Sequence, residues 1–221
     1  MPPTLYAPVK LTLRKQRSAS SPEEILASTS SLLNSYFQPF LAANFRVEDA
    51  EIKGVLNVQE APRILQITQL VTLEMAPVKI NYALAVGTIN TRLEEDECAE
   101  KGPAWTGVNR ALKEAVNHRD SDIILRLPSP FLTRTVNTLL AVESDLRNNW
   151  SAAHHEAIKL ARHGRTQVEI AELLGVTQAA ISQRLKHARW ERYLQICATI
   201  SELLTQARWK MLLPWDLKKD A

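Results

Sequence analysis

The chain has few of the features that mark secreted or membrane proteins. It contains only 2 cysteines in 221 residues, Cys98 and Cys197. They lie far apart in the sequence, which favours a reducing compartment over a disulfide framework. No apolar run is long enough to span a membrane, and the N-terminus lacks a charged segment followed by an apolar one. We therefore expect a cytoplasmic protein that does not contact a membrane.

Signatures of catalysis and of metal binding are also scarce. Ser, His and Asp are all present, but no G-x-S-x-G turn or comparable nucleophile motif occurs. His154 and His155 lie close to Glu156, yet their spacing matches no known zinc pattern. The interpretation that fits such residues is a solvent-exposed helix face. We expect no metal site and no cofactor.

The strongest positive signal is the segment 165–186, RTQVEIAELLGVTQAAISQRLK. Thr166 can cap a first helix, and Glu169 can reach back to complete a capping box. Gly175 follows the last apolar pair, where a tight turn favours a left-handed residue. Thr177 can cap a second helix. The spacing predicts a helix-turn-helix, with these residues on the buried side: Ile170, Ala171, Leu173, Leu174, Val176, Ala180, Ile181 and Leu185.

The opposite side of the second helix is small or polar, and no carboxylate lies between Glu172 and Glu191. Amide side chains suit base edges, and an amine suits phosphates. Gln178, Ser182 and Gln183 are the base-reading candidates, and Thr177 and Ala179 share their face. The phosphate-contacting candidates are Arg165, Thr166, Gln167, Lys186 and Arg189.

The charge distribution supports this interpretation. From Ser151 onward there are 11 Lys and Arg against 7 Asp and Glu, whereas the first 150 residues have 16 against 17. The positive excess therefore lies in the part of the chain that contains the helix-turn-helix, as binding to phosphates requires.

The first two thirds of the chain alternate between strand-like and helix-like runs. We expect strands at 4–13, 45–58 (a pair with a turn at 48–50), 78–89 and 122–127, and helices at 22–37, 62–73, 103–116 and 131–147. Pro8 favours an edge position or a bulge for the first strand. The near-continuous apolar run at 78–89 indicates a central strand. These elements predict an α+β sandwich with helices on one face of a largely antiparallel sheet.

The domain boundary is expected near Asn148 and Asn149. Residues 1–147 would then form the α+β domain, and residues 151–221 the helix-turn-helix domain with a lead-in helix at 151–163 and a C-terminal helix. The apolar tail at 208–215 would be costly to leave in water, so we expect it to pack on the first domain or on a second subunit.

Several segments in this order resemble the SatD family of bacterial proteins. They are Gly54-Val55-Leu56, the strand at 82–89, the helix start at 102–105, Trp150, and VTQAAISQRLKHARW at 176–190. The resemblance implies an N-terminal domain similar to the palm of nucleotide cyclases, a ferredoxin-like α+β sandwich, followed by an all-α helix-turn-helix domain.

The cyclase-like pattern implies two acidic magnesium-binding positions, one on the first strand and one at the next hairpin. Here the first strand offers Lys10 instead, and Ala50 occupies the expected Asp position of the hairpin. Gly102 and Arg110 match the nucleotide-binding part of the pattern, although its asparagine position is held by Thr106. Because Mg²⁺ on a triphosphate requires carboxylate ligands, we expect no enzymatic activity.

Together these observations predict a sequence-specific regulator of transcription that binds double-stranded DNA as a homodimer, with the N-terminal domain as a non-catalytic sensor or dimerisation module. A small-molecule or nucleotide effector is expected to act through that domain. Two alternatives stay open: a nucleotide-binding protein that uses Gly102 and Arg110, with the helix-turn-helix as its output, and a protein-interaction adaptor.

Overall fold

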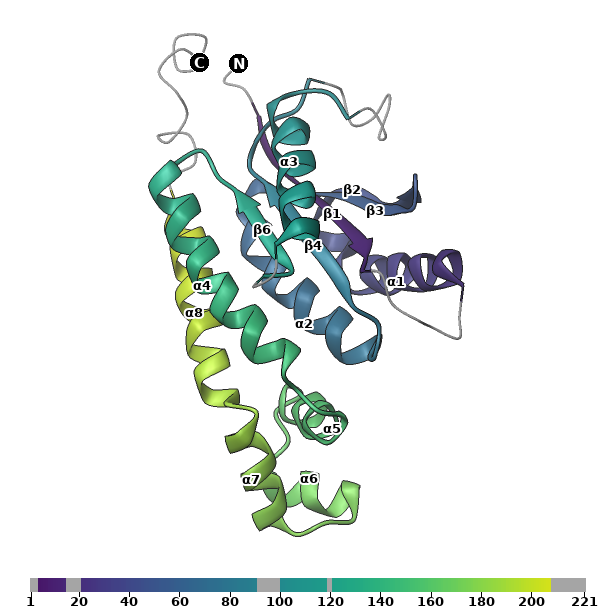
Figure 1. The fold of residues 1–221 in the computed structure, drawn as a ribbon, viewed down its shortest axis with the longest axis vertical. Helices are drawn as coiled ribbons and strands as arrows, with labels where there is room; N and C mark the ends of the chain where they lie inside the picture. Colours follow the sequence, from purple (N-terminus) through teal and green to yellow (C-terminus); the bar gives the residue numbers. More distant parts are fainter. Residues whose placement is uncertain (1–3, 15–20, 91–99, 119–120, 208–221) are drawn as a thin grey trace.

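The structure is a computed structural model that describes residues 4–14, 21–90, 100–118 and 121–207. Within these ranges it is an α+β protein (Figure 1). Its strands are β1 (Leu5–Leu13), β2 (Leu41–Glu48), β3 (Glu51–Asn57), β4 (Ile80–Ala85), β5 (Gly87–Thr88) and β6 (Ile123–Arg126). Its helices are α1 (Pro22–Phe37), α2 (Ile64–Glu74), α3 (Pro103–Asn117), α4 (Pro130–Asn148), α5 (Ala152–Ala161), α6 (Gln167–Leu174), α7 (Gln178–His187) and α8 (Trp190–Gln206), with short 3-10 helices η1 (Gln38–Phe40) and η2 (Val58–Arg63).

The sheet has the strand order β2-β3-β1-β4-β6, and β5 pairs with β1. All pairs are antiparallel except β4 with β6, which run parallel. The edge position expected for the first strand is wrong, because β1 lies in the middle of the sheet. Pro8 pairs with Val55 of β3, and on its other side the partner of β1 changes from β4 to β5 around this point. Proline is tolerated where a ladder is interrupted in this way.

Helices cover both faces of the sheet, so the expectation of helices on one face is also wrong. One face packs against α1, α2, α4 and α8 in the largest hydrophobic cluster. The other face packs against α3, where Val108 and Ala111 meet Ala83 of β4. Gly107 allows this close approach, since a Cβ atom there would lie 3.0 Å from the Cβ of Ala85. Every residue of β4 is buried, and all of them except Asn81 are apolar or aromatic, as expected for a strand covered on both faces.

Helices α5, α6 and α7 follow α4 in the chain, and α8 returns to the sheet region. Helix α8 runs beside α4 (Figure 1), and its Ile200 and Leu204 are fully buried in the sheet-facing cluster. Helices α6 and α7 lie at the end of the molecule farthest from α3. None of the described helices is long and apolar enough to cross a membrane. The apolar tail at 208–215 and most of the acidic segment at 92–101 lie outside the described residues.

Candidate nucleic-acid interface

Helix α6 begins with the capping box that the sequence indicates. The Thr166 hydroxyl accepts the Glu169 N–H at 3.3 Å, and the Glu169 carboxylate accepts the Thr166 N–H at 2.7 Å. The Thr166 N–H and the Thr166 hydroxyl both donate to the Glu169 carboxylate, and these two bonds lower the pKa of Glu169. The helix ends at Gly175, which adopts φ 63° in the left-handed region. Glycine is the residue that adopts this conformation without strain, so the sharp turn toward α7 follows directly from the sequence.

Helix α7 is held against α6 by a small apolar core. Thr177 caps it by accepting the Ala180 N–H at 3.1 Å. Ile181, fully buried, packs on Ile170 and Ala171 of α6, with Leu160, Ala161, Leu174, Val176 and Leu185 around them. The expectation that Leu173 belongs to this core is wrong, because Leu173 is 61% exposed. Its neighbour Leu174 takes the inward position, since one residue along a helix turns the side chain by about 100°.

The outer side of α7 carries the residues expected to contact DNA there. Thr177, Gln178, Ala179, Gln183 and Lys186 are exposed, and Ser182 is half-buried. The structure therefore places these six side chains outside the core, on a helix whose inner side is fixed by packing.

Two of the predicted residues meet in a way that their separation in the sequence did not indicate. The Gln178 side chain donates from Nε2 to Oε1 of Gln167, at 2.7 Å. Both glutamines are the first residues of their helices, α7 and α6. This hydrogen bond restrains the Gln178 amide and leaves its Oε1 and second N–H available, which is the donor and acceptor pair that matches an adenine edge.

A groove of about 530 Å³ lies beside this face, between the start of α6, the end of α7 and the start of α8. It is lined by Gln167, Ser182, Leu185, Lys186, Arg189, Trp190, Glu191 and Arg192. The side chains of Lys186, Arg189 and Arg192 form no ion pair or hydrogen bond with any of the described residues, and Glu191 is the one acidic residue of the lining. Three unpaired cations against one carboxylate make this groove attractive to phosphate.

Arg189 has an unusual backbone. It adopts φ 53° in the left-handed region at the junction of α7 and α8. An arginine there costs free energy that a glycine would not. Arg192 was missed by sequence reasoning, although its position one helical turn after Arg189 is a usable signal.

Two of the other phosphate candidates have partners within the protein. Arg165 pairs with Glu169 at 3.4 Å, and the Thr166 hydroxyl donates to the same carboxylate at 2.9 Å. Both groups are exposed, so this ion pair contributes little stability and does not remove Arg165 from solvent.

The interface is positioned by Trp150 and α5. The Trp150 Nε1 donates to the Ala188 carbonyl at the end of α7, at 3.1 Å. Its ring contacts those of His155, Trp190 and Tyr193 at centroid distances of 6.0, 5.9 and 4.9 Å. Trp150 therefore connects the segment after α4 to both α5 and the α7–α8 junction.

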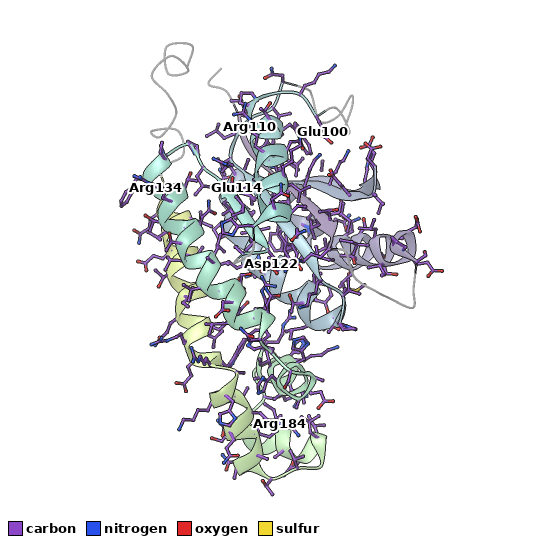
Figure 2. All side chains as sticks on the ribbon, viewed as in Figure 1. Glu100, Arg110, Glu114, Asp122, Arg134 and Arg184 are labelled. Carbon is purple, nitrogen blue, oxygen red and sulfur yellow. The ribbon has the colours of Figure 1, made fainter. Side chains whose placement is uncertain are left out.

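The two residues expected to bind a nucleotide are not brought together. Gly102 begins α3 with φ 111°, and a Cβ atom there would lie 2.9 Å from the Asn90 nitrogen, so close backbone packing explains the glycine. Arg110 is exposed two turns further along α3 (Figure 2), about 12 Å away at the usual helical rise.

A partly buried polar cluster lies under α3, where the cyclase-like pattern implies magnesium ligands. Lys10, only 4% exposed, donates to Glu51 at 3.0 Å and to Glu100 at 2.7 Å. Lys53 pairs with Glu100 at 2.6 Å, and Asn109 donates to Glu100 at 2.8 Å. Burial alone would raise the pKa of Glu100, but these hydrogen bonds lower it to about 2. Because lysine ammonium groups already bind the carboxylates, these residues do not fit a divalent cation.

The sequence model of the SatD family matches residues 12–204. No curated protein matches the chain. One matching solved structure is that of the Regulator of Polyketide Synthase Expression from Bifidobacterium adolescentis, with 14% identity over 93% of this chain and 82% of the other. Its TM-score is 0.32, which is too low to support an argument about fold or function.

Proposed function

This chain belongs to the SatD family, and we propose that it is a regulator of transcription that binds specific sequences of double-stranded DNA. Residues 151–221 form the DNA-binding domain, in which α6 and α7 are a helix-turn-helix. Residues 1–147 form a palm-like sensor or dimerisation domain. The observation that carries the proposal is the outer face of α7, which has no carboxylate. It lies beside a groove whose cations Lys186, Arg189 and Arg192 have no partner among the described residues.

Helix α7 has the dimensions and the chemistry to enter the major groove. An α-helix fits that groove, and glutamine can form a bidentate pair with adenine. Gln178 and Gln183 are exposed on one side of α7, with Ser182 between them. The hydrogen bond from Gln178 to Gln167 fixes one of these amides before DNA arrives, which reduces the entropy lost on binding.

The groove residues Lys186 and Arg189 would contact the phosphates next to the recognition helix. The exposed residues Arg165 and Thr166, with the half-buried Gln167, would contact the DNA backbone from the start of α6. Such contacts fix the position and the register of the protein on DNA, while the glutamines specify sequence.

One copy of such a module buries a small interface, so useful affinity requires two copies. We propose a homodimer that reads two half-sites. The N-terminal domain is proposed to be non-catalytic, because the Lys10 and Lys53 ammonium groups take the place that metal ions require beside Glu51 and Glu100.

The test is selection of bound sequences from a random duplex pool at about 0.15 M salt. The expected result is a motif with two half-sites about one helical turn, roughly 10 base pairs, apart. The Gln183→Ala/Lys186→Ala variant should lose the enrichment. The matched control is Arg134→Ala, which removes an exposed cation from α4 at the other end of the molecule from α7 (Figure 2) and should select the same motif.

Single variants separate the two kinds of contact. Gln183→Ala should relax the preference at one base position by ~1–3 kcal/mol, whereas Lys186→Ala should weaken binding to all sequences alike and reduce the salt slope by about 1. If the pool shows no enrichment and both variants bind like the wild type, the chain does not read DNA through α7.

A further inference from the structure

A second cavity, of about 380 Å³, lies between the sheet region and α5. Its lining includes Thr72, Pro77, Tyr82, Arg147, Trp150 and His155. Cavities of this size hold small molecules. One wall comes from α2, β4 and the turn between them, and the other comes from the end of α4, the connection to α5, and α5 itself. The cavity therefore spans the connection between the sheet region and the proposed DNA-binding helices.

The deep polar wall of this cavity is already saturated by its own hydrogen bonds. The Arg147 guanidinium donates to Asp122 at 2.7 and 3.1 Å, to Glu143 at 2.8 and 3.3 Å, and to Thr72 at 3.0 Å. These five bonds use all five of its N–H groups. Two carboxylates surround this one guanidinium, so the deep wall does not attract an anion.

Lys79 also lines the cavity, but it is exposed in the turn before β4 and already interacts within the protein. The other groups left to bind a ligand are aromatic and neutral. Trp150 and Tyr82 line the cavity beside Pro77 and Ile80. The His155 imidazole contacts the Trp150 ring edge to face, with an angle of 88° between the ring planes, and forms no hydrogen bond to any described residue. Burial and the nearby His154 lower the pKa of His155, so it is neutral at pH 7 and offers one donor and one acceptor.

We propose that this cavity binds a small, uncharged heteroaromatic molecule of about nucleobase size, and that the bound molecule regulates DNA binding. Aromatic walls favour a planar ring, and a neutral imidazole favours a ring that carries both donors and acceptors. The regulatory part of this inference rests on the proposed function, whereas binding to the cavity does not.

The path from the cavity to the recognition helix is short. Trp150 and His155 both line the cavity, and Trp150 also donates to the Ala188 carbonyl at the end of α7. A ligand that shifts the Trp150 ring changes the position of the α7–α8 junction, where the groove residue Arg189 lies. Coupling of this kind typically changes affinity about five- to 150-fold.

The test uses the full chain with three probes: adenine, nicotinamide and benzoate. Adenine or nicotinamide should raise the melting temperature and give a binding isotherm by calorimetry, and benzoate should do neither because it is an anion. The variant Ala152→Phe places a ring at a lining residue that is exposed at the start of α5, so it should abolish binding and still fold. The matched control is Ala153→Phe, since Ala153 does not line the cavity.

DNA affinity is then measured with and without the probe that binds. Adding the probe should change the DNA affinity of the wild type and of Ala153→Phe at least fivefold. It should leave the DNA affinity of Ala152→Phe unchanged. The binding proposal is overturned if no probe binds, if benzoate binds as well as the neutral rings, or if Ala152→Phe binds normally. Binding without any change in DNA affinity overturns the regulation. A chain that binds the probe but no DNA at all contradicts the proposed function instead.

Discussion

The sheet region and the α6–α8 region treat their charged residues in opposite ways. In the sheet region, Arg147 is 2% exposed and has a partner for every N–H, and Lys10 is bound by two carboxylates. In the groove at α7 and α8, Lys186, Arg189 and Arg192 form no ion pair or hydrogen bond within the described part of the chain. Cations with internal partners hold the fold together, whereas unpaired cations remain available to a ligand. We therefore expect a ligand at the groove cations and not at the buried ones.

The largest effect is expected from removing a paired cation. Arg147→Met leaves Asp122 and Glu143 buried without their partner, and breaking a buried pair in this way costs about 3–5 kcal/mol. Urea unfolding measures the loss. Arg134→Ala on the exposed side of the same helix should change stability by less than about 0.5 kcal/mol. If the two variants are equally stable, pairing does not distinguish the regions.

The next effect concerns the paired glutamines of the proposed interface. Gln178→Ala should cost ~1–3 kcal/mol of base discrimination. Gln167→Ala should weaken DNA binding more in the wild type than in Gln178→Ala, because part of its effect acts through the 2.7 Å hydrogen bond between them and the rest through its own contact with the DNA backbone. A coupling of at least about 0.5 kcal/mol in the double-mutant cycle is expected.

The control for this cycle is Gln195→Ala, which removes an exposed amide from α8 and should leave binding unchanged. Additive effects of Gln167 and Gln178 would mean that the hydrogen bond does not orient the amide on DNA.

The response to pH should separate the two regions as well. His154 and His155 have lowered pKa values because of burial and nearby cations, so the folded state favours their neutral forms. The stability they contribute is complete above the unfolded pKa of about 6.5 and is lost as the pH falls below it. His154 also accepts the Ser151 N–H through Nδ1 at 3.2 Å, a bond that protonation removes from the start of α5.

In the sheet region the change comes at lower pH. The pKa of Asp122 is lowered by Arg147 against the effect of burial, and that of Glu100 is lowered to about 2. Their contribution is present above about pH 4.5 and is lost below it. Melting temperatures should therefore fall in two steps. His154→Gln/His155→Gln should remove much of the upper step, and Glu100→Gln should reduce the lower one. A single step unaffected by the histidine variant would contradict this assignment.

The sequence predicts features fixed by local interactions better than features fixed by packing between distant segments. The caps at Thr166 and Thr177 and the turn at Gly175 involve neighbours in the chain, and all three were expected. The central position of β1 and the placement of α3 on the second face depend on strand order, which local patterns do not encode. The contact between Gln167 and Gln178 depends on the angle at which α6 and α7 cross.

The cyclase-like pattern shows the same limit. The lack of an acidic residue before Glu23 is visible in the sequence. That Lys10 would be held by Glu100 is not, since these residues are 90 positions apart and meet only because α3 packs on the sheet. The contacts between distant residues, Gln167 with Gln178 and Lys10 with Glu100, could be obtained only from the fold.

Replacing Arg189 should affect DNA binding more than it affects stability. Arg189→Gly removes an unpaired cation and relieves a left-handed arginine at φ 53°. Relief of this strain is worth about 1 kcal/mol, partly offset by the greater freedom of glycine in the unfolded chain, so the stability should stay within ~1 kcal/mol of the wild type. DNA binding should nevertheless weaken for all sequences, with a salt slope smaller by about 1. Arg189→Lys keeps the charge and should retain the salt slope of the wild type. A cation that is available to a ligand should contribute to binding and not to stability. A large loss of stability in Arg189→Gly with unchanged DNA affinity would therefore show that Arg189 stabilises the fold and does not contact DNA.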